Sequence, residues 1–509
     1  MHLAARLLVV SLLLLSGVAR ANAPAVAWLE AESAADIERA FSKALAERKP
    51  VLLYWGAAWC PPCNQLKATL FNRRDFIERS KSFVAVHLDG DVPGAQQLGA
   101  RFKVRGYPTL VLFSPDRTEL TRLPGEVDAP QVLNVLQLGL AGGRPIEAVL
   151  ADVPAGRALT SNEWRMLAYY SWDSAEARLA PAGRAELLAS LAAACPLTEA
   201  QTRLWLKALA ASDGATGVKA DGRLRRRVLA VLADPAAARA QMDVLTSSAA
   251  EITRALDATG PREALLAGFE RALVRLAADT SLSRADRLSA LAARVELARI
   301  DVANGEPVAL PGRLAGRVRT EAARLDREIT DRYERQAVIT AAAHVLQRAG
   351  LLSDSDALLS ANLGRSHSPY YLMSQLAGNA KQRGDKAQAL DWYARAYEAS
   401  VGAATRLQWG ASYVGALIDL APDDAARIEH AADRLFAEAG AQSAAFHERG
   451  AASLQRAANK LRGWNRDGRH ALALQRLQAQ LDPACRKLDT ADPQRGVCEG
   501  LLWDTAPRL

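Results

Sequence analysis

The sequence predicts an α/β domain at the N-terminus followed by a large all-α region. Up to residue 142, continuous apolar runs typical of buried strands alternate with stretches of helical spacing. After about residue 150, Ala, Leu and Arg dominate, and these residues favour helices because they lose little side-chain entropy there. The 509-residue chain is too long for one ordinary domain and is 50% hydrophobic, so we expect more than one buried core.

The first 21 residues have the pattern of a secretory signal peptide. Arg6 precedes a short apolar core over 7–15, and Ala-Arg-Ala at 19–21 supplies a small-x-small cleavage site. The apolar run is too short for a comfortable transmembrane helix, although an uncleaved membrane anchor is an alternative interpretation. We therefore expect an exported, soluble, periplasmic protein without stable membrane insertion after cleavage, in a compartment where disulfides persist.

The α/β unit is expected over 22–142, and its elements follow a regular order. Ser33 opens the first helix, whose apolar positions between 37 and 45 recur at helical spacing. The expected elements are a strand at 25–29, that helix, a buried strand at 51–55, a helical stretch that includes 66–71, strands at 83–88 and 110–113, a turn at 114–117, an edge strand at 119–123 and a helix at 131–140.

The remainder of the chain is expected to be helical. A Gly-Gly-Arg-Pro segment at 142–145 marks the exit from the α/β unit. A helical segment is expected over 143–211 and a second helical part over 223–509. Between them, residues 212–222 contain three glycines and are interpreted as a linker.

Residues 370–403 contain the clearest internal repeat. Gly384 stands between two stretches of helical spacing, with Ala377 before it and Ala389 after it. This pattern resembles a tetratricopeptide unit, in which small residues lie where two helices touch. Gly350 lies 34 residues before Gly384, which indicates a second, more degenerate unit. The pattern predicts an array of helical hairpins, and an irregular helical bundle is the alternative.

Five cysteines are present: Cys60, Cys63, Cys195, Cys485 and Cys498. A Cys-x-x-Cys pair also occurs in zinc sites, but zinc needs two more ligands, and the sequence has neither a second such pair nor a close His pair. The motif instead follows a buried strand and opens a helix, where free N–H groups and the helix dipole stabilise a thiolate.

We therefore predict that Cys60 is the attacking thiol and that Cys63, one turn further on, resolves the mixed disulfide. Because the number of cysteines is odd, one must lack a partner within the chain. We expect Cys485 and Cys498 to form a structural disulfide, with an electron relay as the alternative. Cys195 is then expected to be free and buried.

Two segments resemble the thioredoxin superfamily. Trp59-Cys60-Pro61-Pro62-Cys63 matches its active-site segment, and Gly106-Tyr107-Pro108-Thr109 matches the segment that holds its cis-proline. The resemblance covers about 25–142 and implies a thioredoxin-like fold that exchanges thiols and disulfides. It implies that Pro108 is cis, faces the cysteines and helps to hold the backbone of the substrate, whereas an ordinary trans loop proline is the alternative. The residues implied to support the site are Trp59, Pro61, Pro62, Tyr107, Pro108 and Thr109.

The sequence departs from this family at three points. Tyr54 stands where thioredoxins place a buried acid, and an apolar residue near Ala85 replaces the usual lysine. A phenol with a pKa near 10 is a poor general base at neutral pH, so proton transfer at Cys63 must use water or another group. An insertion at 90–94 separates the second buried strand from the Pro108 segment. Such variation is common among exported thioredoxin-like proteins.

Other features of the sequence point to no further chemistry. The net charge of +8 is mild for this length, and one dense basic run, Arg223 with 225–227, is interpreted as a solvated helix face. We therefore expect no nucleic-acid partner, no metal and no cofactor. Four aromatic residues close together are interpreted as helix packing, with a ligand surface as the alternative. They are Trp164, Tyr169, Tyr170 and Trp172.

The favoured hypothesis is a periplasmic thiol–disulfide oxidoreductase whose helical region docks protein clients or partners. Because Pro61 and Pro62 have no N–H and no charge, a reductase or isomerase is favoured over an oxidase. We expect such a reductase to be kept reduced by a membrane electron donor. The rival hypothesis is a non-enzymatic helical-repeat interaction protein, in which the Cys60–Cys63 pair only stabilises the fold or senses redox state.

Overall fold

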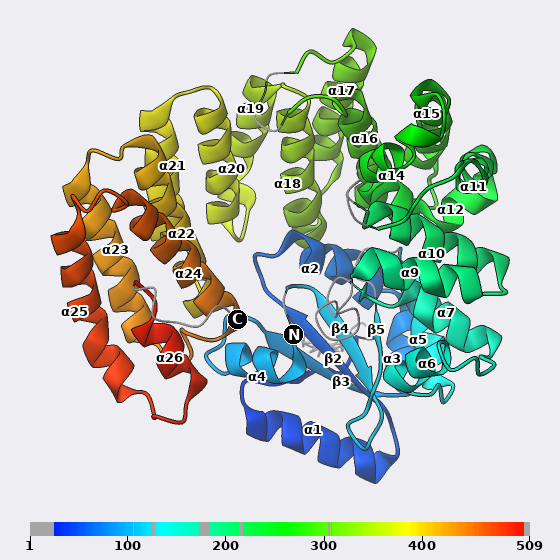
Figure 1. Ribbon diagram of the computed structural model, residues 1–509, viewed down its shortest axis with the longest axis horizontal. Coiled ribbons are helices and arrows are strands. Elements are labelled where there is room, and N and C mark those ends of the chain that lie inside the picture. The colour runs from blue at the N-terminus through cyan, green and yellow to red at the C-terminus, as the bar shows by residue number, and fades with distance from the viewer. Residues whose placement is uncertain are drawn as a thin grey trace, which may run out of the picture.

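A computed structural model describes residues 25–502 except for 105, 124–127, 173–182, 213–216, 304, 305 and 307. The predicted signal segment 1–21 lies outside the described residues, as does part of the predicted linker 212–222. The predicted fold class is confirmed: a small mixed sheet with helices comes first, and a large all-helical region follows (Figure 1).

Five strands form the sheet, in the order β1-β3-β2-β4-β5. The strands β1, β3 and β2 run parallel, β4 is antiparallel to β2, and β5 is antiparallel to β4. The central strand β2 ends at Gly56, so the chain leaves the middle of the sheet on its way to Cys60. The strands are β1 (Leu29–Glu30), β2 (Val51–Gly56), β3 (Val84–Asp89), β4 (Thr109–Phe113) and β5 (Glu119–Leu123).

Helices cover both faces of this sheet, which explains why β2 is apolar throughout. Side chains alternate between the two faces of a strand. The odd-numbered residues of β2 pack with α1 (Ala34–Glu47) and α4 (Ala95–Phe102). Its even-numbered residues lie in the core on the other face, together with α2 (Pro61–Leu66), the π-helical turn η1 (Lys67–Phe71), α3 (Arg74–Ser80) and α5 (Ala129–Leu140).

Two parts of the predicted order differ in the structure. The strand expected at 25–29 is only the two-residue β1, at Leu29–Glu30. The sequence pattern does not indicate α3 and α4, because helices of seven and eight residues are too short to show a full apolar stripe. By contrast, Ser33 caps α1 as predicted, in a capping box with Asp36.

The helical region continues from α5 to the C-terminal end of the described chain. Its helices are α6 (Ile146–Asp152), α7 (Ser161–Tyr169), α9 (Arg184–Ala194), α10 (Thr198–Ala210), α11 (Gly222–Ala233), α12 (Pro235–Ala240), α13 (Met242–Ser247), α14 (Ala249–Ala255), α15 (Arg262–Ala278), α16 (Arg284–Ala298), α17 (Gly312–Glu328), α18 (Arg332–Arg348), α19 (Leu352–Asn362), α20 (Pro369–Gln382), α21 (Lys386–Ala399), α22 (Ala403–Leu420), α23 (Ala425–Gly440), α24 (Glu448–Trp464), α25 (Ala471–Lys487) and α26 (Pro493–Glu499). Two 3₁₀ turns, η2 (Asp257–Thr259) and η3 (Leu363–Arg365), lie between them.

The helices form an arc around the α/β domain (Figure 1). The core beneath the sheet extends through α5 into α7, α9 and α10, so the chain enters the arc without a break in packing. Further along, α18 packs against α2, and α24 packs against α4. The helical region therefore contacts the α/β domain near both ends of the arc and at its middle.

The predicted unit at 370–403 is a helical hairpin. The helices α20 and α21 are joined at Gly384, which has a φ of 80°. Ala377, Ala389 and Ala396 are fully buried, which lets the two helices approach closely. Gly350, with a φ of 75°, joins α18 to α19 in the same way. Only glycine adopts this left-handed conformation without strain. Assignment of the hairpins to the tetratricopeptide type stays a prediction.

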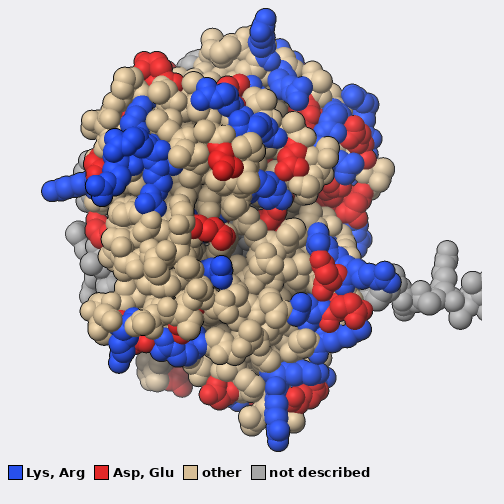
Figure 2. All heavy atoms as spheres, turned by 90° about the vertical axis from the view of Figure 1, so that its right-hand side faces the viewer, with Lys and Arg blue, Asp and Glu red and all other residues tan. Residues whose placement is uncertain are grey.

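The face on the right of Figure 1 carries interspersed basic and acidic side chains around an uncharged area (Figure 2). The interpretation of the basic run as a solvated helix face is wrong for Arg225. This side chain is buried, and its guanidinium donates to the carbonyls of Gly260 and Pro261. Arg225 therefore satisfies backbone groups in the loop before α15 instead of facing water.

A buried ion pair joins three helices near the start of the arc. Arg203 of α10 is 0% exposed and donates to the Asp243 carboxylate of α13 over 2.9 Å. It also donates to the carbonyl of Ala168 and lies over the Tyr169 ring of α7, 4.1 Å from its centroid. Burial raises the pKa of the Asp243 carboxyl, but the paired guanidinium outweighs this effect and holds the pKa below its ordinary value.

We expect Arg203→Met to lower the free energy of unfolding by about 3–5 kcal/mol, because it leaves the Asp243 carboxylate buried without a counter-charge. The double variant Arg203→Met/Asp243→Leu should recover most of that loss. Urea denaturation followed by tryptophan fluorescence measures both changes. A single variant as stable as the wild type would contradict the structural role of this pair.

Candidate functional site

The two cysteines of the predicted redox pair lie at the junction of β2 and α2. Their sulfurs are bonded to each other, and their Cα atoms are 5.2 Å apart. Cys60 is the N-cap of α2, and its Sγ accepts a hydrogen bond from the Cys63 N–H over 3.2 Å. Donors at a helix start stabilise negative charge, so this geometry favours a thiolate at Cys60 once the disulfide is reduced.

The turn that holds the pair is fixed by side-chain and backbone constraints. Pro61 and Pro62 occupy the first turn of α2, where their missing N–H groups cost no helical hydrogen bond. The amide of Asn64, which is fully buried, donates to the carbonyls of Ala58 and Cys60 over 2.8 and 2.9 Å. Asn64 gave no recognisable signal in the sequence, because its role depends on a loop conformation.

The two segments that resemble the thioredoxin superfamily, 59–63 and 106–109, lie together around the disulfide. Trp59 and Tyr107 both pack against the cysteines. The peptide bond between Tyr107 and Pro108 is cis. Thr109 begins β4 opposite Trp55 of β2, and its hydroxyl donates to the carbonyl of Gly106 over 2.7 Å. Each predicted support residue therefore lies in the turn at Cys60 or in the segment that enters β4.

Tyr54 lies in β2 and is almost completely buried. Its ring stacks on His87 with a centroid distance of 5.0 Å. Burial, together with the negative charges of Asp89 and Glu30, raises the pKa of its phenol above the ordinary value. The phenol therefore stays protonated at neutral pH and does not accept the Cys63 proton, which agrees with the expectation from the sequence.

Sequence reasoning treated the insertion at 90–94 only as a departure from the family, but its Asp91 has a specific role. The Trp59 indole donates to the Asp91 carboxylate over 2.8 Å. The same carboxylate accepts from the Thr405 hydroxyl over 2.7 Å and from Arg449 over 3.3 Å. Burial raises the pKa of Asp91, and the Arg449 charge and Thr405 hydrogen bond oppose that rise. Asp91 therefore connects the site to the helical region.

The remaining cysteines lie within the helical region. Cys485 of α25 and Cys498 of α26 are bonded to each other and buried in the C-terminal core. Cys195 has no disulfide partner and is buried after α9. Burial raises the pKa of the Cys195 thiol, so it stays protonated and unreactive at neutral pH.

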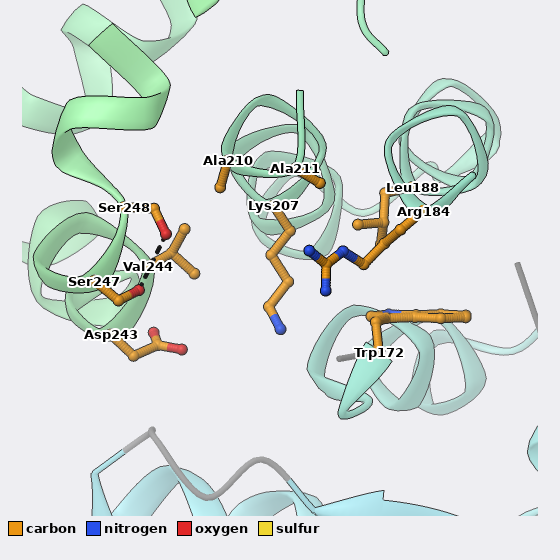
Figure 3. Close-up of a pocket in the computed structure, with 10 residues that line it drawn as sticks. All are labelled: Trp172, Arg184, Leu188, Lys207, Ala210, Ala211, Asp243, Val244, Ser247 and Ser248. Atoms are coloured by element: carbon orange, nitrogen blue, oxygen red, sulfur yellow. Dashed lines mark hydrogen bonds between the residues drawn. The ribbon is translucent and has the colours of Figure 1, made fainter. Parts of the chain in front are cut away.

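A cavity of about 100 Å³ lies between α9, α10 and α13 (Figure 3). Lys207 and Arg184 point into it, and the Trp172 ring forms one side. Both cations have interaction partners. Trp172 and its three aromatic neighbours are buried, which confirms their interpretation as packing residues. The cavity is lined by neither redox cysteine, and we assign it no chemistry.

Within the described part of the chain, no group of three or more His, Cys, Asp or Glu side chains is placed to hold a metal ion. Among the same residues, none of the helices has the length and apolar character needed to cross a membrane.

Comparison with known proteins assigns the α/β domain. A family model described as a thioredoxin-like domain matches residues 37–139. The thiol:disulfide interchange protein DsbD of Pseudomonas fluorescens is 33% identical over 107 residues, which are 20% of this chain and 18% of that protein. Thioredoxin-1 of Drosophila melanogaster is 35% identical over 72 residues, 14% of this chain and 64% of that protein.

A solved structure described as a DsbH oxidoreductase aligns with 23% of this chain and 88% of its own, at 22% identity and a TM-score of 0.20. This chain spans only about a fifth of the length of the DsbD proteins that it matches. Residues 37–139 thus form a thioredoxin-like domain with a Cys-x-x-Cys pair.

In the reduced protein, we expect N-ethylmaleimide to modify Cys60 and to spare Cys63 and Cys195. Cys60 has the N–H donor that favours a thiolate, whereas Cys63 is 0% exposed. Mass spectrometry of the digested protein identifies the modified cysteine. Preferential modification of Cys63 would contradict this assignment of the attacking thiol.

Proposed function

We propose that the protein is a thiol–disulfide oxidoreductase that acts through Cys60 and Cys63. The observation that carries this proposal is the position of the bonded pair at a helix start, directly after the central strand and against the cis-Pro108 segment. The thioredoxin-like domain match and the similarity to interchange proteins support it. The exchange of electrons with the substrate uses the two thiols, and a separate dithiol donor completes the cycle.

The reductive cycle starts with Cys60 as a thiolate. It attacks one sulfur of the substrate disulfide, forms a bond to that sulfur and displaces the other as a thiolate, which takes up a proton. Cys63 then loses its proton and attacks Cys60, which releases the second substrate thiolate and closes the Cys60–Cys63 disulfide. Two electrons pass to the substrate. A dithiol donor must return the enzyme to its reduced form.

The proton of Cys63 must leave by another path than Tyr54, because that phenol is held protonated. Neither Asn64 nor the backbone around the cysteines accepts a proton at neutral pH. We therefore infer that water receives the proton when the mixed disulfide opens the site. In this proposal, no buried carboxylate at the position of Tyr54 is needed for the step.

Electron flow in the reducing direction is supported by the dipeptide between the cysteines. Neither proline provides a positive charge or an N–H that would further stabilise the thiolate form, so the dithiol is not strongly favoured over the disulfide. A reductase or isomerase of protein disulfides is accordingly favoured over an oxidase. The signal-like segment 1–21 supports export to the periplasm, where a membrane donor would supply the electrons.

A second candidate follows from the low exposure of the pair. Cys60 is 2% exposed and Cys63 is 0% exposed, which is also what a structural disulfide in an interaction protein would show. In that case the helical region would be the working part, and the Cys60–Cys63 bond would stabilise the domain or sense redox state. The first experiment below distinguishes the two candidates.

We expect the Cys63→Ala variant to accumulate mixed disulfides through Cys60, because the resolving thiol is absent. The adducts should appear on non-reducing gels of periplasmic extracts and disappear with reductant. Cys60→Ala/Cys63→Ala is the matched control and should form none. If the single variant forms no adduct and the wild type lacks disulfide reductase activity with insulin, the protein is not an oxidoreductase.

We expect the midpoint potential of the Cys60–Cys63 pair to be more negative than about −180 mV, the value of an isomerase. Titration against glutathione, with trapping of free thiols, measures it. A midpoint near −120 mV, about that of the strong oxidant among these proteins, would reverse the proposed direction of electron flow.

A further inference from the structure

Three side chains of the helical region contact the two residues that precede Cys60, Ala58 and Trp59. The His367 ring nitrogen lies 2.8 Å from the carbonyl oxygen of Ala58, in the loop before Cys60. Tyr371 of α20 stacks on Trp59 with an interplanar angle of 16°. The Arg449 guanidinium of α24 lies 4.3 Å from the centroid of the Trp59 ring. We call these three side chains, His367, Tyr371 and Arg449, the wall.

The wall is supported by a packed cluster. Tyr370, Tyr397 and Trp409 are buried behind Tyr371, and Trp59 itself packs against this cluster. The Tyr371 and Trp409 rings meet edge to face at 5.9 Å. Trp59 thus has the disulfide on one side and the helical region on another. The position of this active-site residue is set by both parts of the chain.

Polar contacts at Asp91 hold the wall in place. The side chain of Asp91 is 13% exposed and accepts from Trp59, from Arg449 and from both the hydroxyl and the N–H of Thr405. We call this set of contacts the latch. A Cβ on Gly402, which precedes α22 and has a φ of 100°, would lie 2.6 Å from the Asp91 Cγ. Glycine is therefore required there for the close approach.

Gln96 of α4 connects Arg449 with Tyr107. Its side chain accepts from the backbone N–H of Arg449 over 3.0 Å and donates to the Tyr107 hydroxyl over 3.0 Å. Arg449 also donates to Gln408, which fixes its guanidinium against α22. Trp59 is therefore held directly by the helical region, whereas Tyr107 is held by Gln96 of α4, which in turn accepts from the backbone N–H of Arg449.

The polar contacts of the latch lie beside an unfilled space. A cavity of about 190 Å³ is lined by Val92 and Pro93 of the insertion and by Leu407 of α22, among others. An unfilled space between apolar side chains forfeits their dispersion contacts. At this point the two parts are held by the hydrogen bonds and the charge pair of the latch, whereas behind Tyr371 they are held by ring packing.

We propose that the wall selects substrates for Cys60: with the latch closed, only a disulfide in an extended, single-strand segment of polypeptide reaches the sulfur, and a disulfide within a folded protein does not. This inference rests on the proposed function. The attacking sulfur must come within bonding distance of the substrate sulfur, and Cys60 is only 2% exposed. An extended strand needs far less clearance around Cys60 than a folded domain does.

The test compares access to Cys60 for two reagents of the same chemistry. Reduced protein is treated with N-ethylmaleimide or with a maleimide that carries a long polyethylene glycol chain. Each rate is divided by the rate with the urea-unfolded protein, which removes the difference in intrinsic reactivity. We expect the bulky reagent to be about tenfold or more slower than the small one in the wild type, since modification then requires the latch to open.

The variant Thr405→Val/Arg449→Met removes latch contacts from the helical side and leaves the cysteines, Trp59 and Asp91 intact. We expect it to raise the rate with the bulky reagent about tenfold and to change the rate with the small one little. Tyr371→Ala, which removes the ring stacked on Trp59, is a second variant should the first fail to fold. Arg476→Gln is the control, because its ion pair with Glu429 is exposed and joins α25 to α23.

Equal relative rates for the two reagents in the wild type would overturn the proposal that the wall selects substrates. An unchanged rate with the bulky reagent in the folded variants would overturn it as well. The proposed function is tested separately with one linear peptide disulfide and one disulfide in a folded protein. The wild type should reduce the peptide preferentially, and the latch variant should reduce both. If neither disulfide is reduced but Cys60 still reacts more slowly with the bulky reagent, the wall does restrict access and the oxidoreductase proposal fails.

Discussion

The Asp91 carboxylate accepts hydrogen bonds from both parts of the chain, from the Trp59 indole beside the cysteines and from Thr405 and Arg449 in the helical region. A carboxylate with so little exposed surface requires these partners, because desolvation without hydrogen bonds is costly. Because one carboxylate accepts from both parts, its full set of hydrogen bonds forms only when both parts are in place. The positions of Trp59, α22 and α24 are consequently determined together, and the surroundings of the redox pair depend on how the helical arc closes.

The other contacts between the two parts are distributed along the arc. At its start, Asp128 before α5 pairs with Arg239 of α12 over 2.6 Å. At its middle, Gln65 of α2 donates to Ser283 at the start of α16, and Lys67 lies over the Tyr333 ring of α18. The thioredoxin-like domain is thus held on the side of α5, along α2 and beside α4. A helical region attached in this way differs from an independent arm, because it contacts the α/β domain at several points along its length.

This arrangement divides the tasks of the protein between its parts. The thioredoxin-like domain contains the thiols, the helix start that favours the thiolate and the cis-proline segment. The helical region contributes no second reactive cysteine within the described residues, since Cys195 is buried and the other two are bonded to each other. Its contribution at the site is steric and electrostatic, through aromatic rings and one arginine. The surroundings of the redox pair are therefore built by residues that lie more than 300 positions apart in the sequence.

Features that depend on local patterns can be predicted from the sequence. The continuous apolar run of β2 identifies a central strand, the Ser33 cap identifies α1, and the context of Cys60 and Cys63 identifies a thiol site, because each signal spans only a few neighbouring residues. The helical nature of the second part follows from composition in the same way. The roles of Asp91, Thr405 and Arg449 become visible only in the folded chain, since a polar residue on a loop or helix has no local signal for a distant partner. Burial of Arg225 and the placement of α20 and α24 beside Trp59 likewise depend on packing, which a one-dimensional pattern does not contain.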